Sequence, residues 1–129
     1  MILADTDVLI DYLAGVQPLT ARMQTAFDQD RLATTAVTCF ELLSGAREGN
    51  RGDRVRRLAA ALLVLPLDRE AAGRAAAVRQ RLERAGQSIG MGDSLIAGIA
   101  LAHSAPLWTR NRKHFERVEG LRLVEEDHG

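Results

Sequence analysis

Short apolar segments separated by longer amphipathic stretches make up the hydrophobic pattern of this chain. The first segment, residues 2–4, ends at the polar sequence Asp5-Thr6-Asp7, which is typical of a turn or a helix start. Four similar segments follow at 32–35, 63–67, 107–109 and 121–124. Segments of this length between polar turns are typical of buried strands. The pattern therefore predicts four strands, and a fifth if the last segment forms one.

Between these segments, apolar residues recur at the spacing of helices. Leu19, Met23 and Phe27 follow one another at intervals of four, which places them on one face of an amphipathic helix. The stretch that begins at Asp93 is apolar nearly all round, as expected of a buried helix. The sequence predicts helices at about 8–14, 18–27, 37–47, 53–62, 69–85 and 93–103.

Strands and helices that alternate in this way indicate an α/β fold with a parallel sheet covered on both faces. We expect a single domain with three layers, α/β/α, around a short central parallel sheet of four to five strands. A chain of 129 residues is long enough for one such domain. The domain is expected to cover residues 1–125, with 126–129 as a frayed tail.

The net charge of the chain gives no indication of its function, but the arginines are clustered in three segments. Basic and acidic residues number 17 each, so bulk electrostatics give no reason to expect nucleic-acid binding. Lys113 is the only lysine, and the arginines cluster at 47–57, 79–84 and 110–117. Arginine suits phosphate better than lysine does, although a biased genome composition accounts for the arginine content equally well.

Other features of the composition indicate the compartment. A single cysteine excludes an internal disulfide, which agrees with a reducing environment. No apolar run approaches the roughly 20 residues that a membrane helix needs, and the chain starts without the basic segment of a secretory signal. We therefore expect a cytoplasmic protein that has no membrane contact.

Three acidic residues stand at junctions between the predicted elements: Asp5, Glu41 and Asp93. In α/β folds such junctions gather at the carboxyl edge of the sheet, where ligands usually bind. Three carboxylates at one edge would repel one another unless a cation shared the site. A hard divalent ion with oxygen ligands, Mg²⁺ or alternatively Mn²⁺, is the expected cofactor, and it points to phosphate chemistry.

Each of these carboxylates also has a purely structural interpretation. Asp5 or Asp7 could cap the first helix. Glu41 stands three residues after Thr38, the spacing of a capping box, yet its apolar neighbours suggest a carboxylate that is costly to bury without a partner. Asp93 could be the N-cap of the buried helix.

The turn after the fourth strand adds two further candidates. Asn111 and His114 follow residues 107–109, close to where Asp5 should emerge from the sheet. Either side chain could contact a metal through water, and either could equally be a solvated turn residue.

Three sequence blocks together resemble the PIN-domain proteins of the VapC toxin type. The blocks are DTDVLIDYL, ELLSGA and GDSLIAGIALAHSAPLWTRNRKHFERVEGL, and their order and spacing cover essentially the whole chain. The resemblance implies a PIN-like domain in which Asp5, Glu41 and Asp93 are the catalytic residues. They would coordinate Mg²⁺ or Mn²⁺ for hydrolysis of phosphodiester bonds in RNA, leaving 3′-OH and 5′-phosphate ends.

One position departs from the family pattern. His114 stands where an aspartate or glutamate commonly precedes Phe115, while Asn111 matches the family's asparagine. A second metal should therefore bind more weakly, or His114 positions the substrate phosphate. Asp7 stands where the family often has asparagine, and it restores some of the negative charge.

The resemblance also implies a biological role and partners. The protein would be an endoribonuclease toxin that inhibits translation and growth, held inactive by a VapB-like antitoxin. A homodimer is expected. Candidates for contact with the RNA backbone are Arg47, Arg110, Arg112 and Lys113.

Two competing hypotheses belong to other classes. A degenerate domain would bind RNA or a protein partner without cleavage, and His114 is the residue that motivates this hypothesis. A phosphatase of the HAD type would use Asp5 as nucleophile and Asp7 as acid, but it requires a lysine before the later acidic residues, and Lys113 comes after Asp93.

Overall fold

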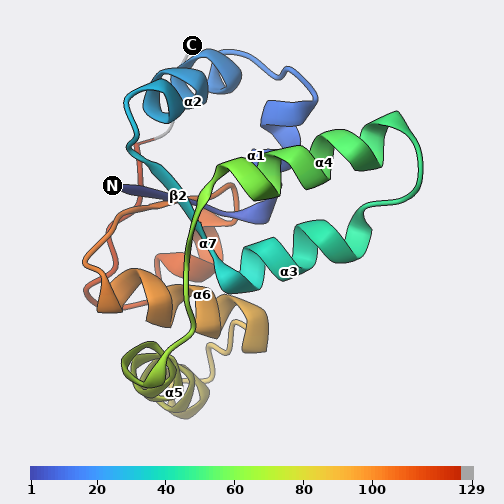
Figure 1. The fold of residues 1–129 in the computed structure, drawn as a ribbon. Helices are drawn as coiled ribbons and strands as arrows, with labels where there is room; N and C mark the ends of the chain where they lie inside the picture. The colour runs from blue at the N-terminus through green and yellow to red at the C-terminus, as the bar shows by residue number, and fades with distance from the viewer. Residues whose placement is uncertain (126–129) are drawn as a thin grey trace.

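Four short parallel strands form the centre of the molecule in the computed structural model, which describes residues 1–125 (Figure 1). Their order across the sheet is β3-β2-β1-β4, and all neighbours run parallel. The strands are β1 (Ile2–Ala4), β2 (Leu32–Thr35), β3 (Leu63–Leu65) and β4 (Leu107–Trp108). This confirms the expected parallel sheet.

The segment 121–124, considered as a fifth strand, does not form one. Only Leu123 makes an isolated bridge, to Leu107. The third strand is shorter than expected because it ends at Leu65, immediately before Pro66, which has no N–H for the ladder. The expected tail at 126–129 lies outside the described residues.

The predicted helices are all present, and one short helix was not predicted. They are α1 (Thr6–Leu13), α2 (Leu19–Asp28), α3 (Ala36–Gly45), α4 (Asn50–Ala61), α5 (Arg69–Arg84), α6 (Met91–Ala102) and the additional α7 (Arg112–Phe115). Helix α4 starts three residues earlier than expected, so its first turn comes from the segment that looked like a polar loop. Among the described residues no helix is both long and apolar enough to cross a bilayer.

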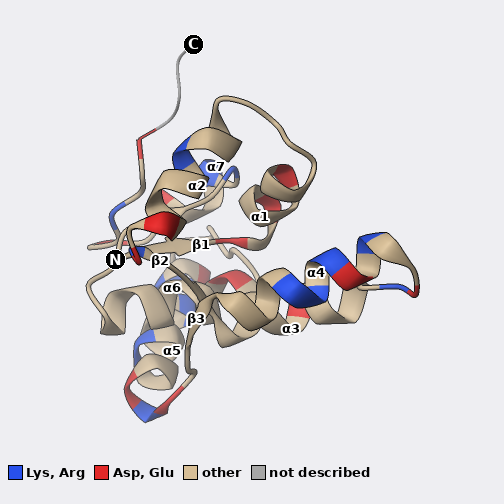
Figure 2. Ribbon diagram, turned by 45° about the horizontal axis from the view of Figure 1, so that its top comes forward, with Lys and Arg blue, Asp and Glu red and all other residues tan. Residues whose placement is uncertain are grey.

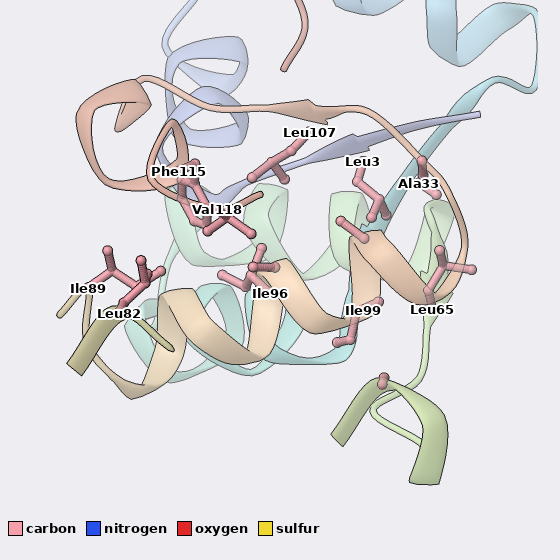
Figure 3. Packing of buried hydrophobic residues seen from close by; sticks show 14 residues of the cluster. Leu3, Ala33, Leu65, Leu82, Ile89, Ile96, Ile99, Leu107, Phe115 and Val118 are labelled. Carbon is pink, nitrogen blue, oxygen red and sulfur yellow. The ribbon is translucent and has the colours of Figure 1, made fainter. Parts of the chain in front are cut away.

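Alternating side chains of the strands enter two separate cores, one on each face of the sheet. Leu3 and Leu107 belong to the core that includes helices α5 and α6, as Figure 3 shows. Ala4 and Trp108, the next residues along the same strands, belong to the core formed with α1, α2 and α4. The arrangement confirms the three-layer α/β/α architecture.

Helices α5 and α6 pack unusually closely. A Cβ atom at Gly98 would lie 2.5 Å from the carbonyl oxygen of Ala71 and 2.6 Å from the Cβ of Ala75. Glycine is therefore required at the crossing. The close packing fixes α6 against α5 at this crossing.

The strand order defines a switch point between β1 and β4. The chain moves from β1 outward to β2 and β3, and then returns to place β4 on the other side of β1. In open α/β sheets, ligands bind outside the carboxyl ends of the strands at such a point. Here those ends lead into Asp5 and Thr109.

Candidate functional site

Asp5 lies at the switch point and is held there by two hydrogen bonds. It follows β1 directly and is only 6% exposed. Its Oδ1 accepts from the backbone N–H of Thr6 at 2.8 Å, so it is the N-cap of α1, and its Oδ2 accepts from Thr109 Oγ1 at 2.8 Å. The capping interpretation is therefore correct, and it leaves the carboxylate oriented towards the end of β4.

The environment of Asp5 disfavours its negative charge. Burial raises the pKa of this carboxyl to about 6, and the charges of Asp7 and, less strongly, Asp93 act in the same direction. The hydrogen bonds from Thr109 and Thr6 oppose the shift of the pKa only in part. The site thus contains more negative charge than its own donors neutralise.

Asp7 is engaged with the chain that leaves β4. The backbone N–H of Arg110 lies 3.2 Å from each of its carboxylate oxygens. Burial raises the pKa of the Asp7 carboxyl, while the bond to Arg110 opposes that shift. Asp7 therefore holds the turn after β4 against the start of α1.

Asp93 forms a compact cluster with Asn111 and His114. Its Oδ2 lies 3.1 Å from Asn111 Nδ2 and 3.0 Å from His114 Nδ1, and these two nitrogens are 2.9 Å apart. The Asp93 carboxylate accepts from Asn111 Nδ2. The role of His114 Nδ1 depends on the tautomer: with a hydrogen it donates to Asp93, and without one it accepts from Asn111.

Asp93 is not the N-cap of its helix, contrary to one interpretation of the sequence. The cap position belongs to Gly90, and Asp93 lies in the first turn of α6. A carboxylate in the first turn is still favoured by the helix dipole. Its side chain is free of a capping role and reaches Asn111 and His114 instead.

Glu41 lies at the outer edge of the site. The N-cap of α3 is Thr35, whose hydroxyl accepts from the N–H of Thr38 at 3.0 Å, so a capping box between Thr38 and Glu41 is excluded. The expectation of a buried carboxylate is also wrong, because Glu41 is exposed. Its Oε1 accepts from Thr6 Oγ1 at 2.9 Å, which brings it next to the residue that follows Asp5.

The donor chemistry fits a hard divalent cation, although the side chains do not yet surround one. Among residues 1–125, no three histidine, cysteine, aspartate or glutamate side chains form a ready metal-binding group. Asp5 and Asp93 are near enough for the charge of Asp93 to raise the pKa of Asp5. Two such carboxylates supply oxygen ligands and an uncompensated negative charge, both of which favour Mg²⁺ or Mn²⁺.

The basic residues that the sequence suggested for RNA contact differ in their availability. Arg47 and Lys113 are exposed, and Arg110 is exposed while it pairs with Asp11 at 3.0 Å. Arg112 is half-buried and donates to the carbonyl of Val124 at 2.7 Å. Arg112 therefore holds the end of the described chain, and the other three present charge to solvent.

Two threonines connect the site, and the sequence interpretation assigned a role to neither. Thr6 links Asp5 to Glu41, and Thr109 links Asp5 to the backbone N–H of Asn111 at 3.0 Å. Thr109 also lies 3.5 Å from Asp7. A hydroxyl directly after a strand at the switch point was the available signal for Thr109. Nothing in the spacing indicated Thr6.

Comparisons with known proteins agree with this geometry. A family model described as the PIN domain matches residues 2–121. The chain is 38% identical to "Ribonuclease VapC10" of Mycobacterium tuberculosis, over 95% of this chain and 91% of that protein. It is 30% identical to "tRNA(fMet)-specific endonuclease VapC" of Shigella flexneri, over 92% of each.

A solved structure shows the same fold. The DNA-bound VapBC complex from Salmonella typhimurium contains a chain that superposes with a TM-score of 0.82 at 26% identity, covering 95% of this chain and 96% of that one. The family match spans both the acidic residues and the strands that position them. The chain belongs to the PIN-domain family.

Proposed function

We propose that this protein is a divalent-metal-dependent endoribonuclease and the toxin of a toxin–antitoxin module. The observation that carries the proposal is the convergence of Asp5 and Asp93 at the switch point, where burial and neighbouring carboxylates raise the pKa of Asp5 to about 6. A cation would neutralise this charge. Relatives that are named as ribonucleases over nearly the whole chain support the choice of RNA as substrate.

The residues have distinct roles in this proposal. Asp5 and Asp93 hold the metal, and Glu41 completes the set by moving inward from the helix edge. Thr109 orients Asp5, and Asn111 and His114 together orient Asp93. Bound Mg²⁺ or Mn²⁺ would activate water for in-line attack and stabilise the charge of the leaving oxygen.

His114 has an additional role in the proposal. Its Nδ1 is engaged by Asp93, so Nε2 is the nitrogen that remains for substrate, and the side chain is 39% exposed. His114 supplies no negative charge where the family commonly has a carboxylate, so the second metal position, if used, is weaker than the first. Exposed Arg110 and Lys113 lie on the same turn and are suited to the RNA backbone.

The proposed partners are a VapB-like antitoxin and a second copy of this chain. The Salmonella typhimurium structure is titled as a VapBC complex, which supports the antitoxin. Apolar side chains suitable for such contacts are available: Phe40 is 69% exposed and Met91 is 66% exposed. An antitoxin would mask the acidic site until it is removed.

Two other functions were considered from the sequence. The phosphatase hypothesis is disfavoured because both oxygens of Asp7, its supposed acid, face the Arg110 backbone N–H. A domain that binds RNA without cleavage remains the second candidate, because His114 removes one carboxylate from the expected set. The two candidates differ in whether metal-dependent cleavage occurs.

The test is a cleavage assay of antitoxin-free protein on total cellular RNA with Mg²⁺ or Mn²⁺, and with EDTA. We expect discrete fragments that require the metal and disappear in Asp93→Asn. Asp28→Asn, an exposed carboxylate on α2 that binds Gln24, is the matched control and should cleave normally. Absence of cleavage by a folded wild-type protein that still binds RNA would favour the binding-only alternative.

A further inference from the structure

Residues 47–57, which we call the arginine tip, form one of the most positively charged segments of the chain. The tip comprises the loop after α3 and the first two turns of α4. It contains five arginines and only two carboxylates, Glu48 and Asp53, although the whole chain has no net charge. Figures 1 and 2 show that α3 and α4 lie side by side and extend beyond the sheet, with the tip at their far end.

Three guanidinium groups of the tip have no partner within the part of the chain that the structure describes. Arg47, Arg51 and Arg57 are exposed and make no hydrogen bond or ion pair through their side chains to any residue within 1–125. Helix α5 also contains five arginines, but three of them are paired: Arg74 with Glu70, Arg79 with Glu83 and Arg81 with Glu119. In the tip, by contrast, only Arg56 of the five arginines pairs with a carboxylate among residues 1–125, so less of its positive charge is neutralised than along α5.

The tip is also built to hold its shape. A Cβ atom at Gly52 would lie 1.6 Å from the carbonyl oxygen of Arg47, so only glycine lets the loop approach α4 this closely. Arg56 donates to the same carbonyl at 3.3 Å and binds Asp53 at 2.7 Å. These contacts fix the positions from which the Arg47 and Arg51 side chains leave the backbone.

Two hydrogen bonds attach this pair of helices to α1, the helix that Asp5 caps. Arg54 of α4 donates to the carbonyl of Leu13, at the C-terminal end of α1, at 2.7 Å. Glu41 of α3 accepts from Thr6, at the N-terminal end of α1. Helix α1 has 8 residues, so its two ends lie about 12 Å apart. The helix pair that carries the tip is thus attached to both ends of the helix that Asp5 caps.

We propose that the arginine tip binds the phosphate backbone of the RNA on one side of the cleaved bond, through Arg47, Arg51 and Arg57. The inference rests on the proposed function. Unpaired guanidinium groups on a rigid support are suited to phosphate oxygens. The alternative occupant, a protein, would need an apolar centre, and residues 47–57 expose no apolar side chain.

The test measures RNA binding as a function of salt. A fluorescently labelled single-stranded RNA is titrated with the protein in EDTA, which prevents cleavage, and the dissociation constant is measured by anisotropy at several salt concentrations. We compare wild type with Arg51→Ala/Arg57→Ala. The matched control is Arg69→Ala/Arg84→Ala, which removes two exposed arginines from α5.

Each phosphate contact with single-stranded nucleic acid contributes about 0.7 to the slope of log affinity against log salt. We therefore expect the tip variant to bind more weakly at low salt, with a slope smaller by about 1.4, while the control keeps the wild-type slope. Equal slopes for wild type and a folded tip variant would overturn the inference. A tip variant that binds RNA like wild type but binds the antitoxin more weakly would also overturn it. Failure of wild type to bind RNA at any salt would instead count against the proposed function.

Discussion

The β1–α1 corner and the outer edge of α3 supply carboxylates to one site from opposite environments. Asp5, at the corner, is 6% exposed, and both of its oxygens accept hydrogen bonds. Glu41, on α3, is exposed and has one hydrogen bond, to Thr6. The corner is fixed by the sheet on one side and by the turn after β4 on the other, whereas the Glu41 side chain is held by the hydroxyl of Thr6.

A metal site needs carboxylates that are held in position and that are charged, and Asp5 and Glu41 each satisfy one of these two requirements better than the other. Burial fixes the geometry of Asp5 but disfavours its charge, so its pKa rises to about 6. Exposure leaves the charge of Glu41 solvated and its position adjustable. We infer that the buried corner sets where the metal binds, and that the exposed edge closes around the metal when it arrives.

The largest expected effect on stability concerns the buried corner. The pKa of Asp5 is raised from 3.8 to about 6 in the folded protein, so protonation of Asp5 stabilises the fold. That stabilisation is complete below about pH 4 and is lost as the pH rises through 6. The shift corresponds to roughly 3 kcal/mol of unfolding free energy between pH 4 and pH 7.

Urea denaturation of the metal-free protein at a series of pH values measures this decline. Asn cannot ionise, so Asp5→Asn should show a decline smaller by roughly 3 kcal/mol. If the unfolding free energies of the two proteins changed with pH in the same way, the pKa of Asp5 would not be raised by folding. Addition of Mg²⁺ at pH 7 should restore stability to wild type and not to Asp5→Asn.

The two regions also differ in how far the sequence predicted them. Asp5 was placed correctly because its position depends only on a strand followed by a polar junction, a pattern that the sequence displays directly. For Glu41 the sequence left a capping box as the alternative to a metal ligand, and its apolar neighbours suggested burial. In the structure Thr35 is the cap and Glu41 is exposed. The helix itself was predicted, but the residue that caps it was not.

The cluster around Asp93 shows a different limit of prediction. The sequence placed Asn111 and His114 in the correct turn, but their contact with Asp93 depends on the position of β4 beside β1. That order follows from packing between residues far apart in the chain, which no local pattern encodes. The short helix α7, which carries His114, was missed for a related reason, since four residues give no periodic signal.

A smaller effect is expected from the hydroxyl that joins the corner to the turn. Thr109→Val keeps the shape of the side chain but leaves Asp5 Oδ2 without its donor and the backbone N–H of Asn111 without its acceptor. We expect cleavage to fall by about 10–100-fold, as for other residues that orient metal ligands, and the pKa of Asp5 to rise further. Rate measurements at saturating metal, together with a denaturation curve, separate the two effects.

Thr109→Ser is the control for this change, because it retains the hydroxyl. Serine should preserve most of the activity if the hydrogen bonds are responsible. Equal losses in the serine and valine variants would show instead that the methyl group and its packing matter, and would remove Thr109 from the site.

The smallest effect is expected at the exposed edge. Thr6→Val removes the bond to Glu41 Oε1 but leaves the Thr6 N–H that Asp5 accepts. A hydrogen bond between partly solvated groups contributes about 0.5–1.5 kcal/mol, so cleavage should fall by less than about tenfold, with a higher metal concentration required for half-maximal rate. Metal titrations of the cleavage rate measure this directly. If the α3 edge closes only around the metal, saturating metal restores the rate of Thr6→Val; a deficit that persists at saturation would mean that Thr6 and Glu41 are as fixed as the corner, and that the site is preformed on both sides.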